Sequence, residues 1–508
     1  MLFFNIIPIV ALCTPLFVLA DESQIPLHPE SSSPRQNDSR VAIVGAGIAG
    51  ASAAFRLREL TRSFPSVSIT IYERESTVGG RVKSIFPPES DHVVEAGATH
   101  FFTDDWCIMT AMNDVGLKEN YSNPFALPRS VGVWDGEELR TAAKCDVESP
   151  SWWDLARSVW KYGLSPRRFR QAVLANLDKW KLFASLRLVD SVGKELEAVG
   201  FDGVILDSAE TYLGNLSISP LFQSDFVQPC TRARFSQNLA DVRGFTSLTA
   251  AGTSKAAAVD GGNARVIERM IELSHADVHL NSRVTNIRPG QHRRYRLSVA
   301  RDHSPYPQHA EFDAVILAAP LQSSKIYLGD LGLHSIVARL PPYVETHVTL
   351  FLTPAELSPK FFDPRLNTSV PDDVLTTSAP SHDPDLLSLS KFPICYRRGC
   401  LPGDECDECD YENVYQVLSR HRMDDGDLVR MIGQQFHEGS QLRDYNISWV
   451  HRQAWPYAFP RYQENHTLLD QIEIAPKLFY LSGAEEVVSS METSCRMGQN
   501  AAKLYWQE

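Results

Sequence analysis

The sequence predicts an α/β fold, in which a parallel sheet covered by helices is interrupted by segments of mixed α and β structure. Two observations support this prediction. Strand-like and helix-like segments alternate near both ends of the 508-residue chain, and the long region between them has a different pattern. A chain of this length can also bury more than one hydrophobic core, so an inserted second domain is expected.

The stretch VAIVGAGIAGASAAF, residues 41–55, contains the first strand, turn and helix. A β-branched apolar strand runs into Gly45, Gly47 and Gly50, and an alanine-rich helix follows. In this context the first glycine makes a tight turn, the second lets a pyrophosphate approach the backbone, and the third lets helix and strand pack closely. The helix N-terminus then faces the phosphates. The pattern predicts a Rossmann-type dinucleotide-binding domain.

The residues that follow discriminate between dinucleotides. The strand VSITIYE ends at Glu73, whose carboxylate would accept hydrogen bonds from both ribose hydroxyls and would disfavour the 2′-phosphate of NADP. Then come Gly79, Gly80 and Arg81, and the run VVEAGATHFF adds Gly97. A nicotinamide domain needs no second glycine pair, whereas a longer coenzyme needs backbone clearance and a cation along its pyrophosphate and ribityl chain. These residues favour FAD.

The middle and the end of the chain also fit a flavin. FYLSGAEE is interpreted as a strand that stops at Gly483, and a helix is expected to begin near Met491 and Glu492. Its N-terminus would stabilise the negative charge that reduction places on the O2 edge of a flavin, with Glu492 as a cap rather than a catalyst. SRVTNI is expected to place Val284 beside the adenine. The predicted cofactor-binding residues are Gly45, Gly47, Gly50, Glu73, Gly80, Arg81, Gly97, Val284, Gly483 and Glu492.

Residues 1–20 explain why the first strand begins so late. The run MLFFNIIPIVALCTPLFVLA has no charged side chain and ends in a small-residue cleavage pattern. We interpret it as a secretory signal peptide cut after Ala20, with an uncleaved membrane anchor as the alternative. Residues 21–39 are expected to be a flexible lead.

Sequons and cysteines agree with secretion. Six Asn-x-Ser/Thr sequons predict glycosylation at surface positions. Removal of Cys13 with the signal leaves eight of the nine cysteines, an even number. Four of these cluster, and disulfides are favoured over a zinc site there. The sequons are at Asn37, Asn120, Asn215, Asn367, Asn446 and Asn465, and the clustered cysteines are Cys395, Cys400, Cys406 and Cys409.

Charge and pattern give the broad organisation. The net charge of -13 argues against a nucleic-acid partner and against an anionic membrane surface. Residues 40–105, 255–330 and 466–508 are expected to form three parts of the FAD domain. A largely helical substrate region is expected over 106–254, and an irregular, cysteine-rich part of the substrate domain over 331–465.

Together these segments resemble the FAD-dependent amine-oxidase-type superfamily and, more narrowly, the prenylcysteine oxidase (prenylcysteine lyase) family. The order and spacing of the motifs fit across most of the mature chain. The FAD motifs are specific for the superfamily, and the middle motifs are moderately specific for the family. The narrower match is carried by Thr231, Arg232 and Gln237 in CTRARFSQN, by Gly261, Gly262 and Asn263 in VDGGN, by Trp455, Pro456, Tyr457 and Pro460 in HRQAWPYAFPRY, and by Ser490, Met491, Glu492, Ser494, Asn500 and Ala501.

The resemblance implies a fold and a reaction. The implied fold is an amine-oxidase-like FAD domain with an inserted mixed α+β substrate domain. In the implied reaction, a small hydrophobic substrate, farnesyl- or geranylgeranylcysteine, loses a hydride from C1 of its prenyl group to the flavin. Water adds to C1, cysteine and a prenyl aldehyde separate, and O2 reoxidises the flavin to give hydrogen peroxide. The resemblance also implies a lysosomal, vacuolar or secreted glycoprotein, for which peripheral membrane association would give access to the substrate.

No catalytic triad and no metal-ligand set is evident in the sequence, so the catalytic residues are not predicted. The flavin carries most of this chemistry, and the protein need only hold C1 near flavin N5, keep the site dry and admit one water. His100 is a candidate active-site histidine, although a structural role is favoured. The expected apolar slot would draw on a few of Trp160, Leu164, Phe169, Leu174, Trp180, Phe183 and Leu186.

Three alternatives remain open from the sequence. An amino-acid or polyamine oxidase would attack a C–N bond, with the WPY stretch at 455–457 as an aromatic wall. An oxidase acting on a prenylated small metabolite would share every motif. A binding glycoprotein without activity is opposed by the intact glycines and Glu73.

Overall fold

A six-stranded sheet contains the first predicted strand near its centre. In a computed structural model of the chain, its strand order is β10–β2–β1–β14–β21–β20, and only β20 runs antiparallel to its neighbour. The inner strands are continuous apolar runs, as expected for parallel strands that are covered on both faces. The bounds are β1 Ser39–Val44, β2 Val67–Tyr72, β10 Asp277–His279, β14 Ala314–Leu317, β20 Glu473–Ala475 and β21 Leu478–Tyr480.

The structure describes residues 39–62, 67–88, 90, 92–120, 129–141, 160–186, 188–201, 203–251, 256–302, 304–379, 382–396, 410–464 and 471–507. These residues belong to one unit, Ser39–Glu508. No helix among them is both long enough and apolar enough to span a membrane.

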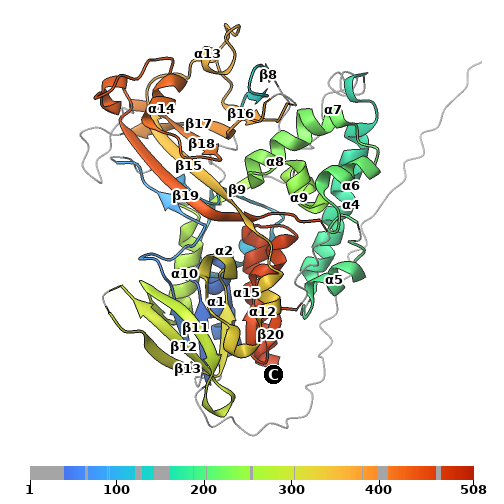
Figure 1. Ribbon diagram of the computed structural model, residues 1–508, viewed down its shortest axis with the longest axis vertical. Coiled ribbons are helices and arrows are strands. Elements are labelled where there is room, and N and C mark those ends of the chain that lie inside the picture. The colour runs from blue at the N-terminus through green and yellow to red at the C-terminus, as the bar shows by residue number, and fades with distance from the viewer. Residues whose placement is uncertain are drawn as a thin grey trace, which may run out of the picture. The chain divides into compact units, whose positions relative to one another are not determined.

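The two ends of this unit are joined by helix packing. Helix α1 (Ile48–Leu60) lies beside α15 (Met491–Gln507), as Figure 1 shows. A Cβ on Gly498 would lie 2.2 Å from the Ala49 carbonyl oxygen, so only glycine allows the two backbones to come this close. A disulfide between Cys107 and Cys495 also ties α2 (Trp106–Asp114) to α15.

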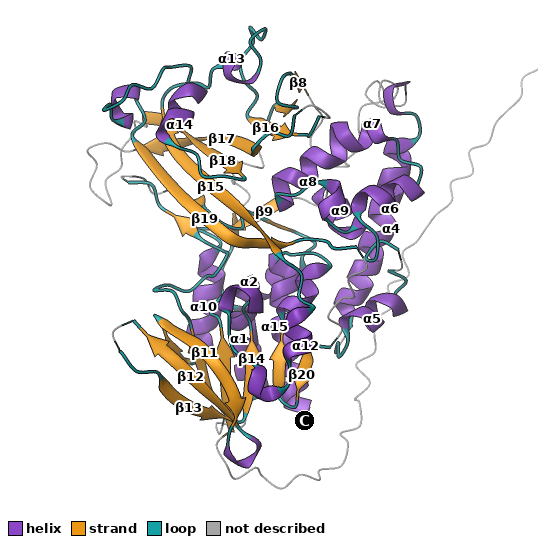
Figure 2. Ribbon diagram, in the orientation of Figure 1, coloured by secondary structure: helices purple, strands orange, loops and turns teal. Residues whose placement is uncertain are grey.

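A seven-stranded sheet, ordered β19–β15–β18–β17–β16–β7–β8, forms a second layer (Figure 2). Most of its strands come from residues 331–465, so the expectation that this region is irregular is wrong. The alternating run YVETHVTLFLT in β15 is a strand signal that the loops rich in Pro, Asp and Cys obscured. The bounds are β7 Val131–Trp134, β8 Leu139–Thr141, β15 Tyr343–Thr353, β16 Asp373–Thr376, β17 Leu386–Tyr396, β18 Asp410–Ser419 and β19 Trp449–Pro460.

The sequence predicts a largely helical region over 106–254, and helices dominate its described residues from 160 to 251. Its earlier part supplies β7 and β8 to the seven-stranded sheet. Figure 2 shows α4 and α6–α9 grouped together. These helices are α4 Ser165–Ser185, α5 Val192–Ala198, α6 Ala209–Asn215, α7 Pro220–Phe222, α8 Gln228–Phe235 and α9 Gly244–Ala250, and the later ones are α10 Ala264–Ser274, α11 Leu321–Ser324, α12 His334–Ala338, α13 Pro359–Phe362 and α14 Asp425–Met431.

Three small sheets complete the fold. Strands β11 (Ser282–Pro289), β12 (Tyr295–Arg301) and β13 (Gln308–Phe312) form an antiparallel sheet that follows β10. Strand β3 (Ser84–Ile85) pairs with β4 (Val94–Glu95). Strand β9 (Ala256–Val259) pairs with both β5 (Phe101–Phe102) and β6 (Glu119–Asn120).

Candidate active site

A cavity of about 1830 Å³ separates the two large sheets. One wall follows the carboxyl ends of β1, β2 and β14, where open α/β sheets bind their ligands. The opposite wall is formed by side chains of β15–β19, and helices α4 and α8 close one side. Ligand pockets usually measure about 300–1,000 Å³, so this cavity has room for a dinucleotide and a second molecule.

The three glycines of the first turn have different surroundings. Gly45 has a φ of +107°, and a Cβ on Gly50 would lie 2.0 Å from the Gly45 carbonyl oxygen. These two glycines are therefore required by the turn and by helix packing, as the sequence predicts. A Cβ on Gly47 would meet nothing closer than Gly80 Cα at 3.8 Å. The protein itself does not require a glycine at 47, and its absent side chain keeps the cavity open.

Glu73 lies at the end of β2 and lines the same wall. Its Oε2 accepts a hydrogen bond from the Ala46 N–H at 2.8 Å, and its Oε1 accepts one from the Glu75 N–H at 3.0 Å. A carboxylate has about four acceptor positions, so capacity remains for two ribose hydroxyls. The structure thus places Glu73, the residue predicted to bind the ribose hydroxyls, directly against the glycine turn.

The second glycine pair lies against the first turn. Gly47 and Gly79 form an isolated parallel bridge, and Gly80 adopts a φ of +59°. Gly97 lies directly against the backbone of Arg81, the residue after this pair, because a Cβ on Gly97 would lie 2.1 Å from the Arg81 carbonyl oxygen. All four glycines line the cavity, which agrees with their predicted role in backbone clearance.

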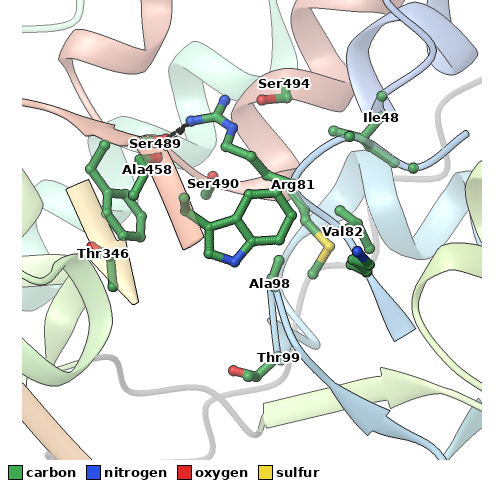
Figure 3. A pocket seen from close by; sticks show the side chains of 18 of the residues that line it. Ile48, Arg81, Val82, Ala98, Thr99, Thr346, Ala458, Ser489, Ser490 and Ser494 are labelled. Atoms are coloured by element: carbon green, nitrogen blue, oxygen red, sulfur yellow. Dashed lines mark hydrogen bonds between the residues drawn. The ribbon is translucent and has the colours of Figure 1, made fainter. Parts of the chain in front are cut away.

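The Arg81 side chain does not extend as a free cation. Its Nη2 donates to Glu485 Oε2 at 2.6 Å, and its Nη1 donates to the Ala458 carbonyl at 2.8 Å. Nη1 also donates to Ser489 Oγ at 3.5 Å (Figure 3). Burial alone would lower the pKa of Arg81, but the Glu485 carboxylate raises it. Arg81 still lines the cavity, so its contact with the pyrophosphate and ribityl chain stays a prediction, although Glu485 offsets its charge.

The three remaining predicted cofactor-binding residues, Val284, Gly483 and Glu492, do not all lie in the cavity wall. Val284 is buried and lines the cavity, close in sequence to the end of β10. Gly483 and Glu492 are not among the described lining residues. Glu492 lies in the first turn of α15, as predicted, but its carboxylate accepts hydrogen bonds from the N–H groups of Cys107 and Ile108 at 2.8–3.1 Å. It caps α2, so its assignment as a cofactor ligand is wrong.

The N-terminus of α15 nevertheless faces the cavity. Ser490, Met491 and Ser494 all line it, and Ser490 Oγ accepts the Thr493 N–H. The helix is 17 residues long, and its dipole would favour a negatively charged ligand edge at this end. This arrangement is the one that the sequence predicts for the pyrimidine side of a flavin.

His100 lies in the cavity wall beyond the glycine loops. Its Nδ1 is 2.9 Å from Thr99 Oγ1, and its ring makes an edge contact with Phe102. Burial, together with the charge of Arg234, lowers the pKa of His100 to about 3. Its imidazole therefore stays uncharged at any physiological pH.

Two family models match this chain. Residues 146–508 match the model of the prenylcysteine lyase family, and residues 43–114 match a NAD(P)-binding Rossmann-like domain. The chain belongs to the prenylcysteine lyase family. Prenylcysteine oxidase 1 of Bos taurus is 26% identical over 495 residues, covering 94% of this chain and 90% of the relative. Farnesylcysteine lyase of Arabidopsis thaliana is 23% identical over 507 residues, covering 96% and 93%.

Solved structures agree on the fold. Cyclohexylamine oxidase from Brevibacterium oxydans IH-35A matches with a TM-score of 0.58 at 14% identity, covering 92% of this chain and 99% of the other. Wild-type putrescine oxidase bound to putrescine matches with a TM-score of 0.54 at 14% identity, covering 92% and 99%. The predicted α/β fold class, with its Rossmann-type domain, is confirmed, as is the family resemblance.

In this member of the prenylcysteine lyase family, some motif residues line the cavity and others join segments of the fold. Trp455, Pro456 and Tyr457 line the cavity, and Trp455 Nε1 donates to the Ala96 carbonyl at 2.8 Å. Arg232, by contrast, is fully buried and ties α8 to Asp383 and to the Pro384 carbonyl. Its role is structural.

Most of the apolar candidates from the helical region are not lining residues. Trp180 lines the cavity, together with Leu177 and Lys181 of the same helix. Phe169 and Phe183 are fully buried core residues, and Leu186 packs against that core. Trp160, Leu164 and Leu174 are 90%, 54% and 40% exposed.

Several lining residues were missed by the sequence analysis. Lys83 donates to Gln453 Oε1 at 2.7 Å, and Arg234 stacks over the Phe102 ring at 4.8 Å. Thr346 of β15 also lines the cavity. Only the period-two alternation of β15 could have drawn attention to Thr346, and the other residues have no local signal.

Three of the six sequons can be located with their side chains. Asn215, Asn367 and Asn446 are exposed. Asn120 ends β6, and Asn37 and Asn465 lie outside the described residues. The expected disulfides among Cys395, Cys400, Cys406 and Cys409 also fall outside what the structure describes. No sequence pattern identifies the Cys107–Cys495 pairing, and Cys230 is disulfide-bonded as well.

Proposed function

We propose that this protein is an FAD-dependent thioether oxidase that cleaves farnesyl- or geranylgeranylcysteine to cysteine, a prenyl aldehyde and hydrogen peroxide. The observation that carries the proposal is the continuous cavity, which joins the glycine loops to the wall around Trp455 and to the apolar side of α4. The family and the names of its relatives, prenylcysteine oxidase and farnesylcysteine lyase, support the choice of substrate.

The residues present fit FAD. The open space over Gly47, the acceptor capacity of Glu73 and the N-terminus of α1 suit an ADP moiety. Gly79 and Gly80 leave backbone clearance further along the wall, and α15 would face the flavin ring. When bound, FAD would supply hydride acceptance and reaction with oxygen.

The side chains of the wall would hold the substrate and control charge. The indole of Trp455 and the ring of Tyr457 line the cavity, and aromatic faces stabilise a positively charged carbon or sulfur. His100 stays neutral, because burial lowers its pKa to about 3, and so it adds no positive charge beside a carbon that becomes cationic. The apolar lining from Leu177 and Trp180 suits a prenyl chain and keeps bulk water away.

We also propose that the protein acts in the secretory pathway, in a lysosome or vacuole or outside the cell. The Cys107–Cys495 disulfide supports an oxidising compartment. Exposure of Asn215, Asn367 and Asn446 suits glycosylation. Access to a prenylated substrate would be through peripheral association with a membrane.

The direct test is a substrate panel with two products measured. Purified protein is incubated with farnesylcysteine, S-ethylcysteine, amino acids and polyamines, and peroxide and aldehyde are quantified. We expect both products from farnesylcysteine and neither from S-ethylcysteine, which lacks the allylic carbon. Peroxide from amines alone would contradict the proposal and favour an amine oxidase. Oxidation of a prenylated metabolite in preference to farnesylcysteine would mean that this metabolite is the substrate and that the oxidation chemistry is the same.

A further inference from the structure

The Thr346 hydroxyl is buried in the cavity wall without a partner. Thr346 is only 3% exposed and lines the cavity. Its Oγ1 forms no hydrogen bond with any described residue. Buried polar groups are nearly always paired with protein or with ordered water, and an unpaired one costs about 1–3 kcal/mol. A polar hydroxyl left unpaired beside a cavity therefore points to a bound molecule.

A break in the strand pairing coincides with this hydroxyl. The register between β15 and β19 shifts between Val344 and Thr346. Such bulges often occur beside active sites, where they redirect a side chain. Val348, two residues on, lines the cavity as well, whereas Thr349 does not. The Thr349 hydroxyl is also buried and forms no hydrogen bond with any described residue. The difference between the two threonines is that Thr346 lines the cavity.

Thr346 lies opposite the cofactor wall. It pairs in register with Trp455, whose indole N–H donates to the Ala96 carbonyl, just before Gly97. In Figure 3 the Thr346 side chain lies on the other side of the pocket from Ile48 and Val82. A small molecule on its hydroxyl would thus be held on the wall that faces the glycine loops, beside the space left for a substrate.

We propose that Thr346 Oγ1 binds and orients the water molecule that hydrates the oxidised substrate. This inference rests on the proposed function. Loss of a hydride from C1 to the flavin of the proposed function, with both electrons of its C–H bond, leaves a cation shared by sulfur and the allylic carbons. The water oxygen forms a C1–O bond and one proton leaves to solvent. The C1–S bond then breaks, the hydroxyl proton moves to sulfur, and cysteine and aldehyde result. Thr346 is a positioning residue in this step.

Three substitutions on one strand isolate the effect. Thr346→Val removes the hydroxyl while keeping the shape, Thr346→Ser restores it, and Thr349→Val is the matched control. In anaerobic single turnovers of the flavin-loaded proteins with farnesylcysteine, we expect bleaching of the flavin to keep the wild-type rate in every variant. Aldehyde release should slow by on the order of 100-fold in Thr346→Val alone, as when a reacting group loses its positioning. Thr346→Ser should recover most of that loss.

A second readout does not depend on activity. A crystal structure of the wild-type protein should show a water on Thr346 Oγ1, which Thr346→Val should lack. Thr346→Val should also be at least as stable to heat as the wild type, because no hydrogen bond within the protein is lost. Wild-type release of aldehyde by Thr346→Val, or equal slowing by Thr349→Val, would overturn the inference. Failure of the proposed function would instead appear as wild-type flavin that farnesylcysteine does not bleach.

Discussion

Arg81 and Glu485 form an ion pair of 2.6 Å that joins positions 404 residues apart. Glu485 is only 5% exposed, and it also accepts a hydrogen bond from Tyr343 at 3.3 Å. The pair connects the second glycine loop to the turn before α15, and both residues line the cavity. Arg81 therefore fixes these two loops against each other in the cavity wall.

Removal of Arg81 should destabilise the protein more than removal of both partners. Arg81→Met leaves the Glu485 carboxylate buried without its cation, which typically costs about 3–5 kcal/mol. The double variant Arg81→Met/Glu485→Gln should recover a large part of that loss, because Gln carries no charge. Urea unfolding of the single and double variants measures both values. Equal stability of the two variants would contradict the pairing.

Gly47→Val should abolish flavin binding without unfolding the protein. The position faces the cavity, and no protein atom lies within 3.8 Å of a Cβ there. The valine side chain would occupy the space proposed for the pyrophosphate. The ratio of flavin to protein in the purified variant measures the effect, and circular dichroism checks the fold. Gly214→Ala is the control, since a Cβ at 214 meets nothing within 4 Å. A yellow Gly47→Val protein would refute the assignment.

Loss of the Cys107–Cys495 disulfide should lower stability by about 2–5 kcal/mol. The bridge closes a loop of 388 residues and fixes α2 against α15, where Glu492 also caps α2. Thermal unfolding of Cys107→Ser/Cys495→Ser, without reductant, measures the loss. Reductant should lower the melting temperature of the wild type and leave that of the variant much less changed. An unchanged melting temperature for the variant would show that the bridge contributes nothing.

Glu95 should make the folded state less stable as pH rises. Burial raises its pKa from 4.5 to about 7, against the lowering effect of hydrogen bonds from Asn263 and Ser84. Between these two values the folded state holds a proton that the unfolded state has lost, so stability falls with rising pH. Glu95→Gln removes this proton difference. The melting temperature of Glu95→Gln, relative to that of the wild type, should therefore be higher at pH 8 than at pH 5. An equal change in the melting temperatures of the two proteins between these pH values would contradict the raised pKa of Glu95.

Local motifs could be predicted from the sequence, and long-range pairings could not. Gly45, Gly47 and Gly50 follow a strand and open a helix, so their turn is specified within a few residues. Glu73 ends the next strand, which places it beside that turn in any fold of this type. The partners of Arg81 and Glu492 lie 404 and 385 residues away, and no pattern in either segment identifies them.

The seven-stranded sheet shows a different limit. Strand β15 carries a clear alternation, but β7 comes from residues 131–134, far from its neighbour β16 in sequence. Pairing of that kind depends on tertiary contacts that strand propensity does not encode. Strand β15 pairs with the distant strand β19 as well, and this pairing places Thr346 beside Trp455 in the cavity wall, so that part of the wall could not be predicted either.

An anaerobic titration of the purified protein with farnesylcysteine tests the proposed thioether oxidase activity most directly. We expect the visible absorbance of bound FAD to bleach in proportion to the substrate added, and farnesal and cysteine to appear in matching amounts. Absence of flavin from the natural protein, or a flavin that stays oxidised with farnesylcysteine but bleaches with an amine, would contradict it.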